Sequence, residues 1–322
     1  MKLNIYNPQV FQGRLNRSNY FEGWYYKHVS GNLEEVYSFI PGISLNENNS
    51  HAFIQVINGV TGKTDYISYS VDQFSASKEK LWVKIGKSVF TENSIKLDIE
   101  SEGLIVKGDL EYSNLVKYPK KIFSPGIMGW YSFIPFMECK HGIVSVNHNV
   151  KGRLRINGRE INFDNGKGYI EKDWGTSFPE AWIWIQANNF KDQNVSFNFS
   201  VAKIPWFGKF FLGFIAFLYY NNRFYLYSTY NNSKITSISQ SNDSLEITLK
   251  NSNTILKIQA SRKSFGELIA PVSGDMSRRI KESVDSEVKL ELSDLKGNLI
   301  YADFSQRAGL EIIDKIFDYL NR

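Results

Sequence analysis

Short runs of aromatic and β-branched residues, separated by clusters of Asn, Gly, Ser and Asp, recur along the whole chain. Such runs favour an extended, pleated backbone, and the residues between them favour turns. Many short strands with frequent turns are typical of antiparallel sandwiches and barrels. We therefore expect a nearly all-β protein. The clearest expected strands are Tyr20–Val29, Glu35–Ile40, Ala52–Ile57, Leu81–Ile85, Ile95–Ile99, Gly103–Tyr112, Ile143–Ile156, Ala181–Asn188, Ser196–Val201, Phe224–Tyr230, Ser244–Leu249, Thr254–Gln259 and Val288–Leu292.

Two segments depart from this pattern. Arg307 to Leu320 carries apolar residues at helical spacing, which predicts a C-terminal helix against a barrel wall. Phe210 to Tyr220 is the most apolar run of the chain, but a membrane-spanning helix needs about 20 such residues. We expect this run to form one or two buried strands.

The chain also contains a repeat. Glu22-Gly23-Trp24-Tyr25-Tyr26 and Glu180-Ala181-Trp182-Ile183-Trp184 both read Glu, small, Trp, apolar, aromatic. At the same offset, Ser38-Phe39 corresponds to Ser196-Phe197. Two correspondences in register indicate tandem duplication. They predict one barrel from residues 1–160 and a second from residues 161–322, divided in the loop-like stretch that contains Asn157-Gly158.

Composition excludes several classes of function. The net charge of +5 is spread over the 322 residues, whereas a nucleic-acid-binding protein clusters its basic side chains, so we expect no nucleic-acid partner. The single cysteine, Cys139, allows no internal disulfide and no cysteine-based metal site, and no zinc pattern is present. The N-terminal residues lack the apolar run of a signal peptide. We expect a cytoplasmic protein without a metal, and peripheral contact with a membrane stays open.

The first segment with candidate functional residues is Tyr20–Lys27. In a strand, Glu22, Trp24 and Tyr26 share one face. A carboxylate beside two rings is costly to bury without a partner. Two interpretations follow: a salt-bridged structural Glu22, or a pocket carboxyl whose pKa is raised by apolar surroundings.

The second segment runs from Gly168 to Asn188. Tyr169, Glu171 and Asp173 share a face if the chain is extended, and Trp174 points the other way. Two carboxyls on one face push their pKa values apart, which favours one of them as a proton donor. A purely structural role is the alternative.

After a Gly/Pro-containing turn, the second strand of this segment also has two distinct faces. One face carries Glu180, Trp182, Trp184 and Gln186, and the other is fully apolar. A strand of this kind is buried on both sides. Its polar side chains then need hydrogen-bond partners.

Histidine is scarce, and His148 lies on the apolar face of an alternating strand. Such a histidine is either a hydrogen-bonded core residue or a proton acceptor. Neither a G-x-S-x-G motif nor a phosphate-binding glycine loop is present, which argues against covalent hydrolysis and nucleotide chemistry.

These segments resemble the tocopherol cyclase family. The resemblance lies in Tyr20–Lys27, Phe39–Gly42, Phe123–Gly126 with Gly129-Trp130, and above all Gly168–Phe190, which carries the pattern E-K-x-W-G…F-P-x-x-W-x-W-x-Q. Asp173 stands where the family more often has Asn, and the chain is shorter than the plant members. The resemblance implies two lipocalin-like antiparallel barrels, similar to those of carotenoid hydratases. It also implies cyclisation of a prenylated quinol or similar isoprenoid to a chromanol, without a cofactor.

Cyclisation requires a proton for a prenyl double bond and then attack by a phenol oxygen on the tertiary cation. We expect Asp173 or Glu171 to be the acid, with Glu22 as the next candidate and His148 as acceptor of the phenol proton. We expect an apolar pocket for an isoprenoid or lipid whose rings stabilise the cation by about 0.5–2 kcal/mol each. The predicted substrate contacts are Trp24, Tyr26, Trp174, Trp182, Trp184 and Gln186. The alternatives are a non-catalytic isoprenoid or lipid carrier, a hydratase that admits one water, and a carbohydrate-binding protein.

Overall fold

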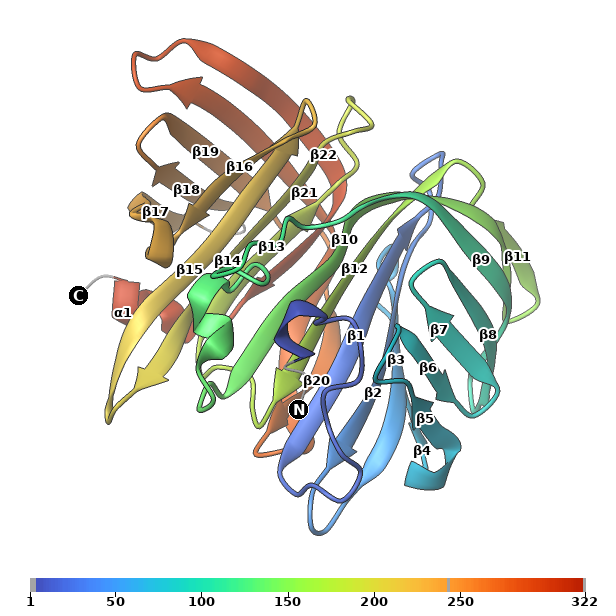
Figure 1. Ribbon diagram of the computed structural model, residues 1–322. Helices are drawn as coiled ribbons and strands as arrows, with labels where there is room; N and C mark the ends of the chain where they lie inside the picture. The colour runs from blue at the N-terminus through green and yellow to red at the C-terminus, as the bar shows by residue number, and fades with distance from the viewer. Residues whose placement is uncertain (1–3, 242–243, 321–322) are drawn as a thin grey trace. The chain divides into compact units, whose positions relative to one another are not determined.

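The computed structural model describes residues 4–241 and 244–320 and contains two antiparallel β-sheets (Figure 1). The expected all-β fold class is confirmed. Each expected strand lies within a strand of the structure or overlaps at least half of one. The apolar run from Phe210 to Tyr220 lies in strand β15, as predicted, between β14 and β16 in the sheet. Only its second part, from Phe214 onward, is largely buried, whereas Phe210 is exposed.

The first sheet has 12 strands in the order β4-β3-β2-β1-β12-β10-β9-β8-β7-β6-β5, with β11 paired to β10. Its strands are β1 (Tyr20–Val29), β2 (Val36–Leu45), β3 (His51–Asn58), β4 (Thr64–Tyr69), β5 (Phe74–Ala76), β6 (Trp82–Ile85), β7 (Ser88–Thr91), β8 (Ser94–Ser101), β9 (Leu104–Val116), β10 (Cys139–Ile156), β11 (Arg159–Asn162) and β12 (Gly166–Gly175).

The second sheet has 10 strands in the order β16-β15-β14-β13-β22-β21-β19-β18-β17, with β20 paired to β21. Its strands are β13 (Trp182–Ala187), β14 (Ser196–Trp206), β15 (Lys209–Tyr220), β16 (Arg223–Ser228), β17 (Lys234–Ser241), β18 (Ser244–Lys250), β19 (Thr254–Ser261), β20 (Gly266–Val272), β21 (Asp275–Asp294) and β22 (Leu299–Ile312).

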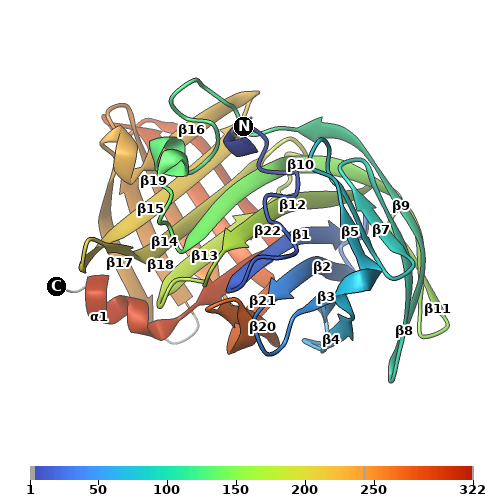
Figure 2. The ribbon, with the colours of Figure 1, turned by 60° about the horizontal axis from the view of Figure 1, so that its bottom comes forward.

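The edge strands of each sheet are consecutive in the chain. In the first sheet β4 and β5 are joined by the 3₁₀ helix η2 (Val71–Gln73), and β3 contacts both β6 and η2. In the second sheet β16 and β17 are joined by η4 (Thr229–Asn231). A sheet whose first and last strands meet curls toward a closed barrel, which removes exposed strand edges. Figure 2 shows this curl in the first sheet. Each sheet surrounds its own apolar core.

The chain divides into two compact units. The first comprises Met1–Asn58, Lys63–Phe178 and Glu267–Ile280, and the second comprises Gly59–Gly62, Pro179–Gly266 and Lys281–Arg322. The boundary expected after residue 160 lies inside β11, which pairs with β10 of the first sheet. The main change of unit comes at Phe178–Pro179, because β12 is hydrogen-bonded between β1 and β10.

The sequence repeat falls on equivalent strands, since β1 and β13 occupy the same place in the two strand orders. The side chains of the repeat nevertheless face opposite ways. Trp24 belongs to the core of the first sheet, whereas Ile183 rather than Trp182 belongs to the core of the second. A shift of one residue reverses the faces of a strand. The two copies therefore lie on equivalent strands but turn opposite faces to their cores.

Helices are few and short in the described part of the chain. The expected helix from Arg307 to Leu320 is too long, because residues up to Ile312 belong to β22. Ala308, Leu310 and Ile312 alternate into the core with the period of a strand. The helical turns are η5 (Asp314–Ile316) and α1 (Phe317–Leu320), with η1 (Asn4–Tyr6) and η3 (Gly129–Phe133) elsewhere. None of the described helices has the length and apolar character needed to cross a membrane.

Candidate active site

Strand β12 separates two chemically different faces at the centre of the first sheet. Ile170 packs in the apolar core and Trp174 lies against it. Lys172 lies opposite Trp24 of β1 and shares that core-directed face. Tyr169, Glu171 and Asp173 alternate onto the other face, as the sequence predicts. Tyr169 and Glu171 are buried there.

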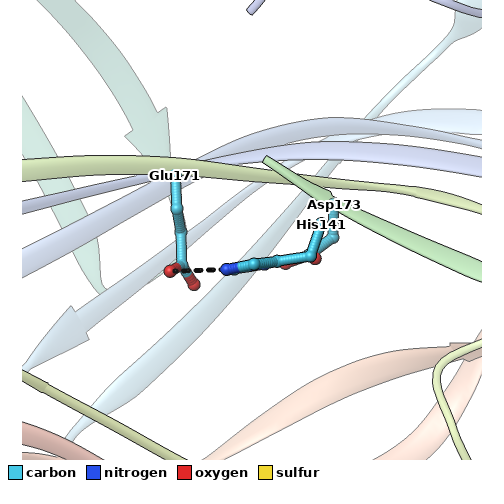
Figure 3. A group of neighbouring side chains, drawn as sticks. All are labelled: His141, Glu171 and Asp173. Atoms are coloured by element: carbon cyan, nitrogen blue, oxygen red, sulfur yellow. Dashed lines mark hydrogen bonds and ion pairs between the residues drawn. The ribbon is translucent and has the colours of Figure 1, made fainter. Parts of the chain in front are cut away.

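The structure brings a histidine from β10 to this acidic face. His141 lies opposite Asp173 in the register of β10 and β12. Its Nδ1 is 2.9 Å from Asp173 Oδ1, and its Nε2 is 3.7 Å from Glu171 Oε2. Figure 3 shows the imidazole between the two carboxylates. All three side chains are largely screened from solvent, with exposed fractions of 15% for His141, 7% for Glu171 and 22% for Asp173.

Tyr169 extends this group by one hydrogen bond. Its hydroxyl donates to Glu171 Oε2 over 2.5 Å. Burial raises the pKa of Tyr169 well above its usual value, and the neighbouring charge of Glu171 raises it further. The phenol therefore keeps its proton and stays a donor. The result is a continuous chain of polar groups from Tyr169 through Glu171 and His141 to Asp173.

Cys139 borders the same group but is not activated. Its Sγ is 4.0 Å from Asp173 Oδ1. Burial raises the pKa of the Cys139 thiol well above its usual value, and the charge of Asp173 adds to the effect. The sulfur is therefore a neutral thiol near pH 7 and a poor nucleophile.

His141, Glu171 and Asp173 also offer ligand atoms within 4.8 Å of one another. The imidazole, however, presents Nδ1 to Asp173 and Nε2 toward Glu171. One ion would use a single ring nitrogen, and each nitrogen faces a different carboxylate, with Nδ1 already in contact with Asp173. The arrangement fits an imidazole oriented by Asp173 and paired with Glu171 better than a three-ligand metal site.

Glu22 lies in a different cluster, on the core side of β1. It forms an ion pair with Lys172, and both side chains are fully buried. The carboxylate also accepts hydrogen bonds from the backbone N–H groups of Gln12 and Gly13 and from the Tyr20 hydroxyl, at distances of 2.5–3.1 Å. These partners match the structural interpretation of Glu22, and they hold the N-terminal segment across the sheet.

Lys172 completes this buried cluster. Its Nζ donates to the carbonyl of Pro8 and lies 4.7 Å from the Trp24 ring centroid and 4.9 Å from that of Trp174. Burial lowers its pKa to about 8, although Glu22 acts in the opposite direction. Trp24 and Trp174 thus stack on a structural cation. Their predicted role as substrate contacts stays a prediction.

His148 and Tyr26 lie on the core face, away from Glu171 and Asp173. Tyr26 donates to the Thr91 carbonyl over 3.0 Å. His148 Nδ1 is 3.0 Å from the Ser145 hydroxyl, and its ring packs on Tyr112. Burial lowers the pKa of His148 well below its usual value. The structure therefore does not bring His148 to the acidic residues, and His141 occupies the place that we expected it to fill.

The remaining predicted contacts belong to the second unit. Trp182, Trp184 and Gln186 share a buried face of β13, opposite the apolar face formed by Ile183 and Ile185. Their burial argues against binding of carbohydrate through exposed rings.

Two contacts fix the tryptophans of this face. Trp182 Nε1 donates to Glu311 over 2.5 Å, and the Trp184 ring covers Gly309. Glu180, by contrast, is exposed and forms ion pairs with Lys203 and Lys315.

The model of a protein family described as tocopherol cyclase-like matches residues 110–313, well over half of the chain. The chain belongs to this family. The matched range contains Glu171, Asp173 and His141. Of the segments on which the resemblance was first noted, Tyr20–Lys27 and Phe39–Gly42 lie outside it.

Two curated relatives are plant tocopherol cyclases. The chain is 24% identical over 195 residues to a probable chloroplastic tocopherol cyclase of Oryza sativa, covering 57% of this chain and 41% of the rice protein. It is 37% identical over 62 residues to the chloroplastic tocopherol cyclase of Zea mays, covering 19% of this chain and 13% of the maize protein. The chain thus spans less than half the length of each of these relatives.

Solved structures share the fold of this family member. Among them are CghA bound to Sch210972 (TM-score 0.56, 9% identity, 94% of both chains), kievitone hydratase from Nectria haematococca (TM-score 0.54, 10% identity, 96% of this chain and 94% of the other) and a putative AttH from Nitrosomonas europaea (TM-score 0.51, 12% identity, 90% and 92%). At these identities the likeness concerns the fold alone.

Proposed function

We propose that this protein catalyses the cofactor-independent, acid-driven cyclisation of a prenylated quinol or similar isoprenoid. The observation that carries the proposal is the chain Tyr169–Glu171–His141–Asp173 on one face of β12 and β10. Membership of the tocopherol cyclase-like family supports it. A cyclase requires a positioned acid of this kind, whereas a protein that only carries a lipid does not.

The two carboxyls have different positions in the relay and hence different roles. Asp173 accepts a hydrogen bond from Nδ1 of His141, which orients the ring and directs Nε2 at Glu171. Nε2 lies 3.7 Å from Glu171 Oε2, so a small closing movement on substrate binding would let one proton pass between the imidazole and the Glu171 carboxyl. The Tyr169 hydroxyl bonds to the same carboxyl and holds its orientation. Asp173 is therefore a positioning residue and Glu171 the proton donor.

The reaction balances with these groups alone. Glu171 delivers its proton to one carbon of the prenyl double bond, which leaves a tertiary cation on the other carbon. The phenol oxygen forms a bond to that cation, and its proton returns to the Glu171–His141 pair. General acid catalysis of this kind contributes about 10²- to 10⁴-fold in rate. Trp182, Trp184 and Gln186 stay predicted substrate contacts.

The test is turnover of a short-chain prenylated hydroquinone, followed as chromanol by chromatography and mass spectrometry. We expect Glu171→Gln to lower kcat by at least about 10²-fold. Asp173→Asn keeps the size of the side chain and alters the orientation of His141, so it should lower kcat less and shift the pH–rate profile. Glu180→Gln is the matched control, because Glu180 is an exposed carboxyl of the repeat. Full turnover by both site variants would show that the acid lies elsewhere.

The same assay separates the alternatives. A carrier would bind the prenylated hydroquinone without converting it, and Glu171→Gln would leave its affinity unchanged. A hydratase would yield a product heavier by one water. Lipid or isoprenoid binding and a cytoplasmic location stay proposals alongside the cyclase activity.

A further inference from the structure

Exposed aromatic and aliphatic side chains gather in the connection between β9 and β10. This connection, residues 117–138, contains η3 and is called the docking loop below. Single exposed apolar side chains are common, but a contiguous group of them marks an interaction surface. The exposed members are Ile122 (76%), Phe123 (81%), Trp130 (43%), Phe133 (41%) and Phe136 (50%).

Tyr6 of η1 ties the two ends of this loop into one surface. Its hydroxyl donates to the Ile122 carbonyl over 2.6 Å, and its ring lies 6.3 Å from that of Phe133 in a T-shaped contact. The backbone carbonyl of Tyr6 accepts a hydrogen bond of 2.6 Å from Lys120 Nζ. Figure 1 shows η1 and the loop next to each other. Ile122 and Phe123 therefore project from a braced loop.

The charge of the surface is basic. Lys117, Lys120 and Lys121 are all exposed and directly precede Ile122. Glu92 pairs with Lys117 at 2.7 Å, and Glu138 stands at the other end of the loop. The lysines thus outnumber the carboxylates, and Lys121 lies closest in sequence to the apolar tip.

We propose that the docking loop seats the protein on the surface of an anionic lipid membrane. Ile122 and Phe123 would enter the acyl boundary, while Trp130 and Tyr131 would lie at headgroup depth, where amphipathic rings are favoured. Lys121, next to the apolar tip, would face lipid phosphates, and Lys117 and Lys120 would add positive charge near them. A second copy of this chain is disfavoured as the occupant because two identical lysine clusters would face each other. Protein interfaces also deplete lysine from their centres.

This inference goes beyond the proposed chemistry and does not depend on it. The docking loop leads directly into β10, and the backbone N–H of His141 donates to Met128 Sδ over 3.1 Å. An apolar molecule that left the membrane beside Phe123 would therefore contact a loop that also contacts the candidate site. The partner is identified by charge and apolar surface alone.

The experiment measures co-sedimentation of the full chain with vesicles of phosphatidylcholine, with and without phosphatidylglycerol. We expect binding to the anionic vesicles, weakened by salt. The double variant Ile122→Ser/Phe123→Ser should lower partitioning at least about tenfold, and Lys121→Gln about fivefold. Phe207→Ser is the matched control, since Phe207 is 79% exposed in the second unit, and it should change partitioning less than about twofold.

Three outcomes would overturn the proposal: no binding of the wild type to anionic vesicles, equal binding by the double variant, or an equal loss from Phe207→Ser. A dimer in sedimentation equilibrium that the double variant disperses would assign the surface to a second copy instead. Thermal unfolding checks that each variant is folded. Because no substrate is present, failure here leaves the cyclase proposal untouched.

Discussion

The ion pair between Glu22 and Lys172 provides a sharp test of how the first sheet is held together. Replacing Glu22 by Gln keeps the size of the side chain and removes its charge. Lys172 would then be a fully buried cation whose remaining partners are the Pro8 and Val10 carbonyls and two indole rings. Removing one partner of a buried pair costs about 3–5 kcal/mol of unfolding free energy at pH 7.

The pH dependence makes this prediction specific. Burial lowers the pKa of Lys172 from 10.5 to about 8, so between these values the unfolded chain binds more protons at this site than the folded chain. The contribution of Lys172 to stability therefore rises as the pH rises through that window. Near pH 10 the amine of the wild type is neutral, and Glu22 keeps the Gln12, Gly13 and Tyr20 donors. The difference between wild type and variant should then shrink below about 1 kcal/mol.

Urea unfolding followed by tryptophan fluorescence at pH 7 and pH 10 measures both quantities. The control is Glu291→Gln, which breaks the exposed ion pair with Lys257 at 3.3 Å and should cost less than about 0.5 kcal/mol. A cost below about 1 kcal/mol for Glu22→Gln at pH 7, or an equal cost at both pH values, would refute the reasoning.

Two further predictions concern one buried position in each unit. Burial lowers the pKa of His28 to about 3 and that of His148 well below its usual value. Below pH 6.5 the unfolded chain therefore binds more protons than the folded chain, and the unfolding free energy decreases as the pH is lowered. Between pH 7 and pH 5, His28 alone should lower the unfolding free energy by about 2 kcal/mol, and a flat urea midpoint would contradict this. In the second unit, Gly309→Ala places a Cβ 2.5 Å from the Trp184 ring and should cost about 1–3 kcal/mol in thermal unfolding. Gly126→Ala, with no heavy atom within 4 Å, should be nearly neutral.

Local periodicity in the sequence determined much of this protein. Alternation alone placed Tyr169, Glu171 and Asp173 on one face of β12 and Lys172 and Trp174 on the other. It also separated Trp182 and Trp184 from the apolar face of β13. These inferences succeed because the faces of a strand depend only on spacing within that strand.

Pairing between distant strands could not be inferred in the same way. His141 meets Asp173 because β10 and β12 pair in a register that contains bulges, and no spacing in the sequence encodes that register. Likewise, Glu22 finds Lys172 only through the pairing of β1 with β12. The sequence identified Glu22 and Asp173 as candidate carboxyl groups. Only their partners, Lys172 and His141, show that Glu22 belongs to a structural ion pair.

The Glu-small-Trp repeat separates what the sequence determines from what only the tertiary structure determines. Its position in each half follows from the sequence and marks equivalent strands, β1 and β13. Its orientation does not, because Trp24 faces its core and Trp182 faces away. Local residues determine that a strand forms and which side chains share a face. Which of those faces is turned inward is decided by hydrogen-bond register and burial across the whole sheet, and therefore only by the tertiary structure.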